Sequence, residues 1–573
     1  MRTDVSGWAT RLSEQDVVRY TRSGAWRNTT LADCARRLAQ QSPERTAVVE
    51  GARTATFAEV YAQAQRLASA FNVLGLRPGG VISLQLPNWI ETLAINLAAC
   101  MGGLVVNPIV PIYREAEVGY ILKDARTRLF LVPRSFRGFD YPDMARRLRK
   151  GLPDLQEVVV LGGSAEDCTS YEALLRLGGT STVHATPDAN AVKLVLYTSG
   201  TTGAPKGVLH SHNTIMSEID AVIRFWGIDT RDVVLMPSPV THITGYLYAL
   251  ELAFAAGVQV VLMDRWNAAQ AVDLIARHGV SFSVGATPFL KELVAAVESG
   301  GTALPSLRRF MSGGAPVPPE VVQRATRVLP DCLTFRVYGS TEAPTITLGI
   351  RDRSEAELGA VTDGRIVNHE VRIVDADDAS VDDGVDGEIC TRGPELMLGY
   401  TDAHHNTEAF DADGYFRTGD LGFRSHGDFL TVSGRKKDLI IRGGENLSPK
   451  EIEDALHQHP AVKEVACVAM PHARLGETVC AFVIPQPGCS VDVAAVAAHL
   501  ERAGLARQKF PERVELVEDL PRTASGKVQK NLLRARIAQL LAGEAASAGR
   551  ADTSAAWWAG TDVPVSQSDG TRQ

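Results

Sequence analysis

The sequence has no Cys-x-x-Cys pair, since its eight cysteines are spread singly along 573 residues. Without that spacing, a zinc site of the usual kind and a dense disulfide framework are not expected, and the cysteines fit a reducing cytoplasm. Surplus positive charge is lacking too, because 59 Lys and Arg stand against 67 Asp and Glu and give a net charge of -8. No overall positive field attracts nucleic acid, so nucleic acid is not expected as a partner.

An export signal and an uninterrupted membrane span are also missing. The N-terminal residues reach the charged Arg11 and Glu14 without the apolar core of a signal peptide. Residues 92–113 are uncharged and long enough to cross a bilayer, but a Gly-Gly pair and two prolines interrupt any helix there. We predict a buried helix that runs into a strand, in a cytoplasmic protein without a transmembrane segment.

The chain has the length and the apolar content for more than one folded core. Its 573 residues exceed the roughly 250–300 at which a single hydrophobic core stops growing. The share of hydrophobic residues is 45% and that of charged residues is 22%, which is ordinary for a globular protein. At least two domains are therefore expected.

The alternation of segments along the chain predicts the fold class. From residue 30 to about 350, helical stretches such as 57–74 alternate with short apolar runs such as 81–86, which predicts stacked α/β layers. From 371 to 434 the pattern changes to short β-rich pieces with Asp-Gly turns. The predicted fold is α/β, with a large N-terminal domain of stacked α/β layers that carries a β subdomain, followed by a small α+β C-terminal domain.

A glycine and a charge cluster at residues 434–438 predict the boundary between the two domains. The large domain is then 1–434 and the small one 435–543, with a last helix over 527–541. Residues 544–573 are rich in Ala, Ser, Gly, Asp and Thr and poor in apolar side chains, so they are predicted to form a disordered tail.

The strongest local signal is the loop 198–207, Thr-Ser-Gly-Thr-Thr-Gly-Ala-Pro-Lys-Gly, which follows the strand-like run 192–197. Glycines let backbone N–H groups approach an anion, hydroxyls add donors, and a lysine adds positive charge, so the loop suits a polyphosphate. It is not a Walker motif, because Lys206 is followed by Gly207 in place of Ser or Thr. The alternative of a flexible linker fits poorly with the apolar strand before it.

Six segments, in this order along the chain, resemble the signature motifs of the adenylate-forming superfamily. That superfamily comprises acyl- and aryl-CoA synthetases, carrier-protein-loading adenylation domains and firefly-type luciferases. The segments are 197–207, 337–342, 415–420, 434–438, 442–449 and 521–527. The resemblance implies two half-reactions, in which ATP and a carboxylic acid form an acyl-AMP and a thiol then takes the acyl group. It implies ATP, Mg²⁺ and coenzyme A (CoA) as cofactors, and a small domain that is mobile.

The same resemblance implies roles for individual residues in the first half-reaction. The β- and γ-phosphates would be held by Thr198, Ser199, Gly200, Thr201, Thr202, Gly203 and Lys206. Thr341 would touch the α-phosphate, Glu342 would bind Mg²⁺, and Lys527 would bridge the carboxylate and the α-phosphate. Adenine and the acyl group would lie against Tyr338, Gly339, Gly313, Gly314 and Ala315, and the ribose would lie against Asp420 and Arg435. Taken alone, residues 340–342 are typical of a helix N-cap, Asp420 of a turn and Arg435 of a solvated charge.

For the second half-reaction the resemblance implies a rotation of the small domain about Lys437. The rotation would replace the lysine loop by the segment of Gly443, Gly444 and Glu445. An enzyme that loads a carrier protein in place of CoA remains an alternative. An inactive nucleotide-binding regulator is a further one, and it is disfavoured because the predicted catalytic lysines and carboxylates are all present.

Three segments, 237–248, 283–289 and 312–315, resemble the walls of the acid pocket, and none of them contains Asp or Glu. An amino-acid substrate needs an anion for its ammonium group, so amino acids are disfavoured. The substrate side chain would lie against His242, Ile243, Gly245, Gly285 and Gly313, with His242 as a gate beside the adenylate. A structural histidine that caps a turn is the alternative for His242. The sequence looks most like CoA ligases for medium-chain fatty acids and alicyclic acids of the cyclohexanecarboxylate type.

Overall fold

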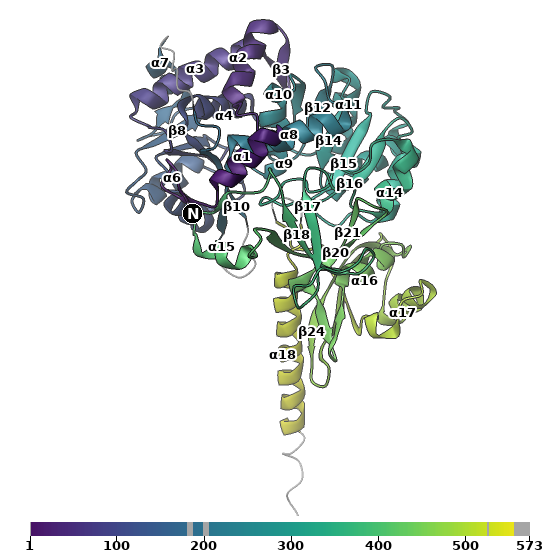
Figure 1. The fold of residues 1–573 in the computed structure, drawn as a ribbon. Coiled ribbons are helices and arrows are strands. Elements are labelled where there is room, and N and C mark those ends of the chain that lie inside the picture. The colour runs from purple at the N-terminus through teal and green to yellow at the C-terminus, as the bar shows by residue number, and fades with distance from the viewer. Residues whose placement is uncertain (1, 180–186, 199–204, 524–526, 555–573) are drawn as a thin grey trace, which may run out of the picture. The chain divides into compact units, whose positions relative to one another are not determined.

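The computed structural model describes residues 2–179, 187–198, 205–523 and 527–554 (Figure 1). The chain divides into a large unit, residues 1–437 with 522–527, and a small unit, residues 438–521 with 528–573. Both units contain helices and strands, and the large unit contains most of the sheet structure. The predicted α/β class, with a large N-terminal domain and a smaller C-terminal one, is confirmed.

Two mainly parallel sheets form the framework of the large unit. The first has eight strands in the order β19 (Gly399–Tyr400), β11 (Lys206–Ser211), β10 (Val192–Thr198), β6 (Val105–Pro108), β5 (Val81–Leu84), β7 (Leu129–Pro133), β8 (Glu157–Leu161) and β9 (Thr169–Ser170). The second has seven strands in the order β16 (Leu333–Val337), β15 (Arg309–Gly313), β14 (Phe282–Gly285), β12 (Val233–Met236), β13 (Gln259–Leu262), β3 (Thr46–Glu50) and β4 (Arg53–Thr56).

A layer of helices lies between the two sheets, because one hydrophobic cluster joins side chains of both sheets to the helices. Its helices are α2 (Leu31–Gln41), α3 (Phe57–Val73), α4 (Ile90–Gly102), α7 (Tyr171–Gly178), α8 (His212–Trp226), the π-helix η1 (Tyr246–Glu251) and α10 (Leu252–Ala255). The outer faces are covered by α5 (Glu115–Asp124) and α6 (Tyr141–Arg149) on the first sheet, and by α11 (Ala268–His278), α12 (Thr287–Gly300) and α13 (Pro319–Val328) on the second. These are the predicted stacked α/β layers.

Local sequence explains why the central helices begin where they do and why they are buried. Thr30 and Thr56 each cap a helix by accepting a hydrogen bond from the backbone N–H three residues on, and Asp33 or Glu59 completes a capping box. The uncharged stretch 92–113 contains most of α4 and all of β6, and both are buried. The predicted buried helix that runs into a strand is therefore confirmed, and no helix among the described residues is long and apolar enough to cross a membrane.

The predicted β subdomain is an antiparallel sheet of four strands. Its order is β17 (Glu370–Val374), β18 (Gly387–Arg392), β20 (Phe416–Ser425) and β21 (Phe429–Arg435). Short elements complete the large unit: β1 (Arg2–Thr3), β2 (Ala9–Thr10), α1 (Glu14–Ser23), α9 (Ile243–Gly245), η2 (Arg353–Glu355), α14 (Ala356–Val361) and α15 (His404–Ala409). The 3-10 helix η3 (Lys436–Asp438) contains the point at which the chain passes from the large to the small unit.

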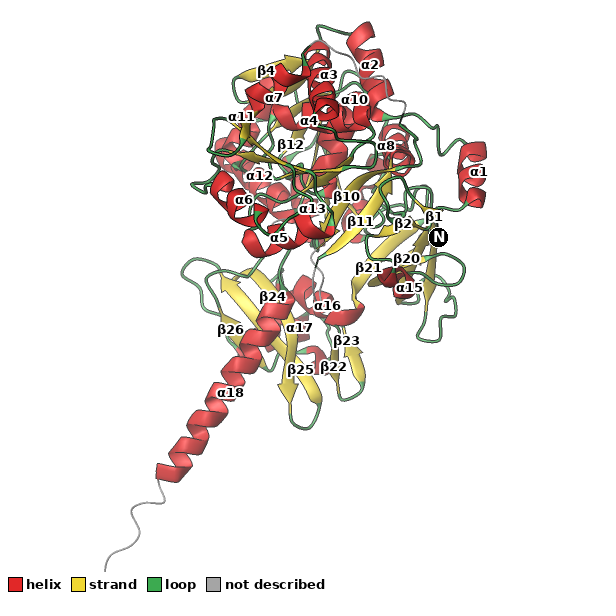
Figure 2. Ribbon diagram, turned by 90° about the vertical axis from the view of Figure 1, so that its left-hand side faces the viewer, coloured by secondary structure: helices red, strands yellow, loops and turns green. Residues whose placement is uncertain are grey.

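The small unit is a five-stranded sheet with helices on both faces (Figure 2). Its strands are β22 (Ile440–Arg442), β23 (Glu445–Leu447), β24 (Val462–His472), β25 (Gly476–Pro485) and β26 (Arg513–Leu516), and a short 3-10 helix, η4 (Arg507–Lys509), precedes β26. Alternate residues of β24 face α16 (Pro449–Leu456) and α17 (Val493–Arg502), and the residues between them face α18 (Lys530–Ser554). This alternation follows from the period of two in a strand.

The last helix continues further than the sequence predicted. We predicted that it ends at Leu541 and that a disordered tail begins at residue 544, but α18 extends to Ser554. The physical reason is composition, because four of residues 545–551 are alanine, the residue with the highest helix propensity. Trp557 and Trp558, the only aromatic residues of the predicted tail, lie outside the described residues.

Candidate active site

Four adjacent parallel strands bring most of the predicted nucleotide and acid segments to one edge of the second sheet. Strands β12, β14, β15 and β16 are neighbours, with Gly285 opposite Ser312 and Gly313 opposite Val337. The segment 237–248 follows β12, and Tyr338 follows β16. Ligands of open α/β sheets bind at the carboxyl ends of parallel strands, so this edge is the candidate site.

Three predicted pocket glycines are required by close packing within the protein. A Cβ at Gly245 would lie 2.2 Å from the carbonyl oxygen of Pro239, and one at Gly313 would lie 2.6 Å from that of Val337. A Cβ at Gly285 would lie 2.3 Å from the Phe289 ring. We predicted these glycines as space for a substrate, but in the structure neighbouring protein atoms occupy the space beside each of them. Ile243, the other apolar pocket residue, is buried.

The predicted adenine and ribose residues form one cluster. The Tyr338 hydroxyl donates a hydrogen bond to Asp420 Oδ2 at 2.8 Å. The opposite oxygen, Oδ1, lies 2.8 Å from Nε of Arg435, which is paired with Asp420 across β20 and β21. Burial and the Asp420 charge raise the pKa of Tyr338 far above its ordinary value, so the phenol stays protonated.

Two glycines near this cluster have backbone geometry that a side chain would disturb. A Cβ at Gly339 would lie 2.5 Å from the backbone nitrogen of Thr345, and Gly314 has a φ of +77°. Ala315 follows in the same turn after β15. Of the predicted residues in this turn, Gly314 is exposed, and Gly313 and Ala315 are half-buried.

Glu342 was predicted to bind the metal and Lys206 to bind the phosphates. Both side chains lie beside Tyr400, a residue that sequence analysis did not single out. The Tyr400 hydroxyl donates a hydrogen bond to Glu342 Oε1 at 3.0 Å, and Lys206 Nζ lies 5.4 Å from the centre of the Tyr400 ring. Tyr400 belongs to β19, which pairs with β11, the strand that begins with Lys206. The partner is 58 residues from Glu342 in sequence, so local patterns gave no sign of it.

A buried histidine fixes the turn that contains Thr341. His210 on β11 donates a hydrogen bond from Nε2 to the backbone oxygen of Thr341 at 2.8 Å, and its Nδ1 lies 3.2 Å from the Thr214 hydroxyl. Burial lowers the pKa of His210 to about 4, so the ring is neutral at pH 7. Sequence analysis missed this residue as well.

His242 precedes α9 and has no side-chain capping bond there. Its backbone N–H donates to Pro239 O at 3.0 Å, and its carbonyl accepts from Tyr246 N at 2.8 Å. Burial, together with a smaller effect of the Lys527 charge, lowers the pKa of His242 to about 4. The imidazole is therefore neutral at pH 7 and can donate or accept a hydrogen bond.

Lys527 lies in the segment 522–527, which groups with the large unit. The ends of this segment bond to each other, since Thr523 N donates to Lys527 O at 2.8 Å and Lys527 N donates to the Thr523 hydroxyl at 3.1 Å. Burial and the Arg435 charge lower the pKa of Lys527, while Asp420 and Glu342 act in the opposite direction. The ammonium group is thus electrostatically coupled to three predicted site residues.

The predicted thioester segment belongs to the small unit. Gly443 and Gly444 form the two-residue turn between β22 and β23, with φ values of +61° and +93°. Glu445 is opposite Arg442 in this hairpin, and all three predicted residues of the segment are exposed. Lys437 lies within η3, at the junction of the two units.

One part of the predicted phosphate loop is described. Thr198, the last residue of β10, is opposite Lys206 at the start of β11. Five predicted residues, Ser199, Gly200, Thr201, Thr202 and Gly203, lie outside the described residues.

Comparison with known proteins assigns the family. The sequence pattern of the AMP-binding enzyme family matches residues 35–401, and that of the AMP-binding enzyme C-terminal domain matches residues 451–527. The chain belongs to the AMP-binding enzyme family. It is 34% identical to the medium-chain fatty-acid–CoA ligase of Escherichia coli K12, over 92% of this chain and 94% of that protein.

Further relatives of this AMP-binding enzyme include one whose name mentions AMP but not CoA. It is 31% identical to the 2,3-dihydroxybenzoate-AMP ligase of Bacillus subtilis 168, over 94% of this chain and 98% of that protein. Among solved structures, ATP-bound MatB from Rhodopseudomonas palustris is similar with a TM-score of 0.79 and 28% identity, over 89% of this chain and 99% of that one. The predicted membership of the adenylate-forming superfamily is confirmed.

The residues of this AMP-binding enzyme fit a magnesium ion that is bound together with a nucleotide. Among the described residues, no group of three or more His, Cys, Asp or Glu side chains is arranged to hold a metal. Glu342 keeps one carboxylate oxygen outside its hydrogen bond with Tyr400, and Thr341 is its neighbour. Mg²⁺ typically binds one or two carboxylates and the substrate phosphates, so a single carboxylate is sufficient.

A third residue missed by sequence analysis is Glu218 on α8, which is fully buried. Its carboxylate accepts hydrogen bonds from Tyr248 of the predicted acid-pocket wall and from Thr345. The three predicted wall segments contain no acidic residue, but this neighbouring helix supplies one. Because Glu218 is separated from Thr345 by 127 residues, only the folded structure reveals the contact.

Proposed function

We propose that this enzyme is an ATP-dependent acid–CoA ligase. It would convert a carboxylic acid to an acyl-AMP with release of pyrophosphate, and then transfer the acyl group to the thiol of CoA. The proposal depends on one observation, the cluster of Tyr338, Asp420 and Arg435 beside the carboxyl ends of parallel strands in an AMP-binding enzyme. The similarity to a medium-chain fatty-acid–CoA ligase supports CoA as acceptor and a medium-chain or alicyclic acid as substrate.

In the first half-reaction the substrate carboxylate attacks the α-phosphorus of ATP, and the P–O bond to pyrophosphate breaks. The reaction depends mainly on positioning and on stabilisation of the phosphate oxygens. Asp420 would accept hydrogen bonds from the ribose hydroxyls, as a carboxylate does from a vicinal diol. Lys527 would hold the carboxylate against the α-phosphate, and Thr341 would donate to the same phosphate. Mg²⁺ at Glu342 would neutralise phosphate charge.

In the second half-reaction the CoA thiol attacks the carbonyl of the acyl-AMP, and AMP leaves with the electrons of the C–O bond. We propose that the domain of residues 435–543 rotates about Lys437 for this step, while residues 1–434 hold the nucleotide and the acid. Gly443, Gly444 and Glu445 would then replace the Lys527 loop. His242, neutral at pH 7, would act as the gate between acid and thiol.

We further propose that the enzyme works in the cytoplasm and in fatty acid metabolism. The absence of Cys-x-x-Cys pairs and the name of the medium-chain relative support this assignment. The loading of a carrier protein is the second candidate function. It is favoured by the 31% identity to a 2,3-dihydroxybenzoate-AMP ligase, whose name mentions no CoA.

A two-stage assay with the purified full-length enzyme tests the proposal. Pyrophosphate release is first measured with ATP, Mg²⁺ and a panel of acids that differ in chain length and ring content. CoA is then added, and acyl-CoA and AMP are measured. We expect the highest kcat/KM for medium-chain or alicyclic acids, and AMP release that requires CoA.

Two other results would replace the proposal. Pyrophosphate release without thioester formation from CoA, but with transfer to added carrier protein, would establish the second candidate. ATP binding by calorimetry without pyrophosphate release for any acid would identify a regulator in place of a ligase.

A further inference from the structure

Two hydroxyls from distant segments converge on one buried carboxyl group. The Tyr248 hydroxyl on η1 donates to Glu218 Oε1 at 3.2 Å, and the Thr345 hydroxyl donates to the same oxygen. The two hydroxyl oxygens lie 3.1 Å apart. Tyr248 is part of the predicted acid-pocket wall, and Thr345 follows the turn of Thr341 and Glu342. Glu218 therefore connects the acid segment to the nucleotide segment.

A second buried carboxyl group, that of Glu395, lies within hydrogen-bonding reach of the first. Glu395 is fully buried and accepts hydrogen bonds from the Asn368 amide and from His369 Nε2, the latter at 3.1 Å. His369 Nδ1 lies 2.9 Å from the Thr391 hydroxyl on β18. Asn368 has a φ of +61°, so its backbone is held in a conformation that few non-glycine residues adopt. The second carboxyl is thus fixed by the β subdomain.

Two carboxylates that lie side by side in a buried site repel each other, so one of them retains a proton. Burial and the Glu395 charge raise the pKa of Glu218 well above its ordinary value. Burial raises the pKa of Glu395 to about 7, although hydrogen bonds with Glu218 and Asn368 oppose the rise. Glu218 Oε2 receives no hydrogen bond from any described donor, which a proton shared with Glu395 explains.

Few other charges act on the pair. His369 is neutral at pH 7, because burial lowers its pKa to about 4. Tyr248 stays protonated, since burial and Glu218 raise its pKa far above its ordinary value. Arg224, on the same helix as Glu218, favours the ionised form of Glu395. The charge state of the site therefore depends chiefly on the burial of the two carboxyl groups and on their mutual interaction, with Arg224 acting against protonation of Glu395.

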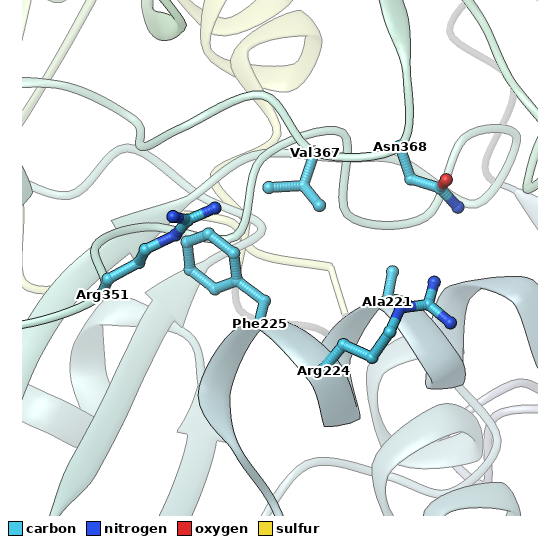
Figure 3. A pocket seen from close by; sticks show the side chains of 6 residues that line it. All are labelled: Ala221, Arg224, Phe225, Arg351, Val367 and Asn368. Atoms are coloured by element: carbon cyan, nitrogen blue, oxygen red, sulfur yellow. The ribbon is translucent and has the colours of Figure 1, made fainter.

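A pocket of about 230 Å³ lies near this site (Figure 3). Asn368, which donates to Glu395, lines the pocket together with Arg224, an exposed side chain. Figure 3 shows Arg351 against the Phe225 ring on the side away from Asn368, with the guanidinium carbon 5.2 Å from the ring centre. Asn368 thus contacts both the pocket and the Glu395 carboxyl group.

We propose that Glu218 and Glu395 share a single proton and act as a positioning pair that holds Tyr248 and Thr345 for the adenylation step. The part that concerns adenylation rests on the proposed ligase function. When the proton is lost, the two adjacent charges repel each other, and the hydroxyl contacts of Glu218 change. Activity and stability should therefore both depend on the shared proton.

The protonated carboxyl can be detected without any substrate. Infrared spectroscopy of the wild-type enzyme at pH 7 should show the carbonyl band of a buried protonated carboxyl group, and this band should be absent in Glu395→Gln. A glutamine amide would donate to Glu218 in place of the shared proton, so the variant keeps the hydrogen-bonding pattern with one ionisable group fewer. Absence of the band in the wild type would overturn the proposal.

Thermal unfolding as a function of pH gives a second readout. A carboxyl with a raised pKa makes the folded wild type bind about one more proton than the unfolded chain between roughly pH 5 and 7, so stability falls as pH rises there. The melting temperature of Glu395→Gln relative to wild type should therefore increase with pH over this range. Asp232→Asn, which removes a buried carboxylate paired with Arg308, should show no such increase. A flat difference for Glu395→Gln contradicts the pair.

Kinetics separate positioning from general stability. Glu218→Leu should raise the KM for the acid by about tenfold or more, because Tyr248 and Thr345 lose their acceptor. Glu218→Gln keeps an acceptor oxygen, so its KM for the acid should be close to that of the wild type. Because this variant has no shared proton to lose, its activity should not show the fall that accompanies loss of that proton. Equal KM values for the Leu and Gln variants would contradict the positioning role. The infrared and unfolding results decide the shared proton even if no acid substrate is found.

Discussion

At the residue scale, the charge state of Lys527 in the candidate site depends on its neighbours. Lys527 is coupled to Arg435, Asp420 and Glu342, and its pKa is lowered chiefly by burial. A lowered pKa means that the ammonium loses its proton at a lower pH than an exposed lysine does. Because the proposed role of Lys527 requires its positive charge, adenylation should slow as pH rises through that lowered pKa.

The variant Lys527→Ala tests this role. We expect acid-dependent pyrophosphate release to fall by about 10²–10³, since a preorganised charge that stabilises a transition state contributes that much. Thioester formation from a supplied acyl-AMP should be spared. Lys527→Arg, which stays charged at high pH, should move the alkaline fall in adenylation to higher pH. Lys150→Ala, at an exposed lysine of the same unit, is the control. Near-normal adenylation in Lys527→Ala would exclude the assignment.

At the element scale, sequence predicted what is encoded locally. The helix α4 and the strand β6 follow from an uncharged run that a Gly-Gly pair divides, and the central helices follow from their caps. Strand β11 was missed, because its six residues between a loop and a helix give no distinct period. Tyr400, His210 and Glu218 were missed because they contact Glu342, Thr341 and Thr345, which are 58, 131 and 127 residues away from them in that order. Long-range pairing, which no local pattern records, decides those contacts.

The hairpin of β22 and β23 allows a test of one element by itself. The φ of +93° at Gly444 is outside the range that other residues adopt, whereas the +61° at Gly443 is accessible to asparagine. Gly444→Val should therefore distort the turn, and Gly443→Asn should not. We expect thioester formation to slow by about tenfold in Gly444→Val, a cost of one strained residue, with pyrophosphate release unchanged in both variants. Equal loss of both half-reactions in Gly444→Val would show that the hairpin has no specific role in the second step.

At the scale of the whole molecule, the chain is unequally divided, and the lysine loop is grouped with the large unit although it is continuous with the small one. Residues 522–527 belong to the large unit, and the strands and helices before and after them belong to the small one. The proposed rotation about Lys437 requires backbone freedom at that position.

Proline at the junction tests that freedom directly. Lys437→Pro fixes φ near -65° at residue 437 and restricts Lys436 as well. The rates of thioester formation and of adenylation are each measured in a single turnover. We expect the ratio of the first rate to the second to fall by at least about tenfold, because the rotation then limits thioester formation. Lys437→Ala removes the same side chain but keeps the backbone free, so its ratio should match that of the wild type. If the proline and alanine variants have the same ratio, residue 437 is not the hinge, and the alternation of the two units must depend on another part of the junction.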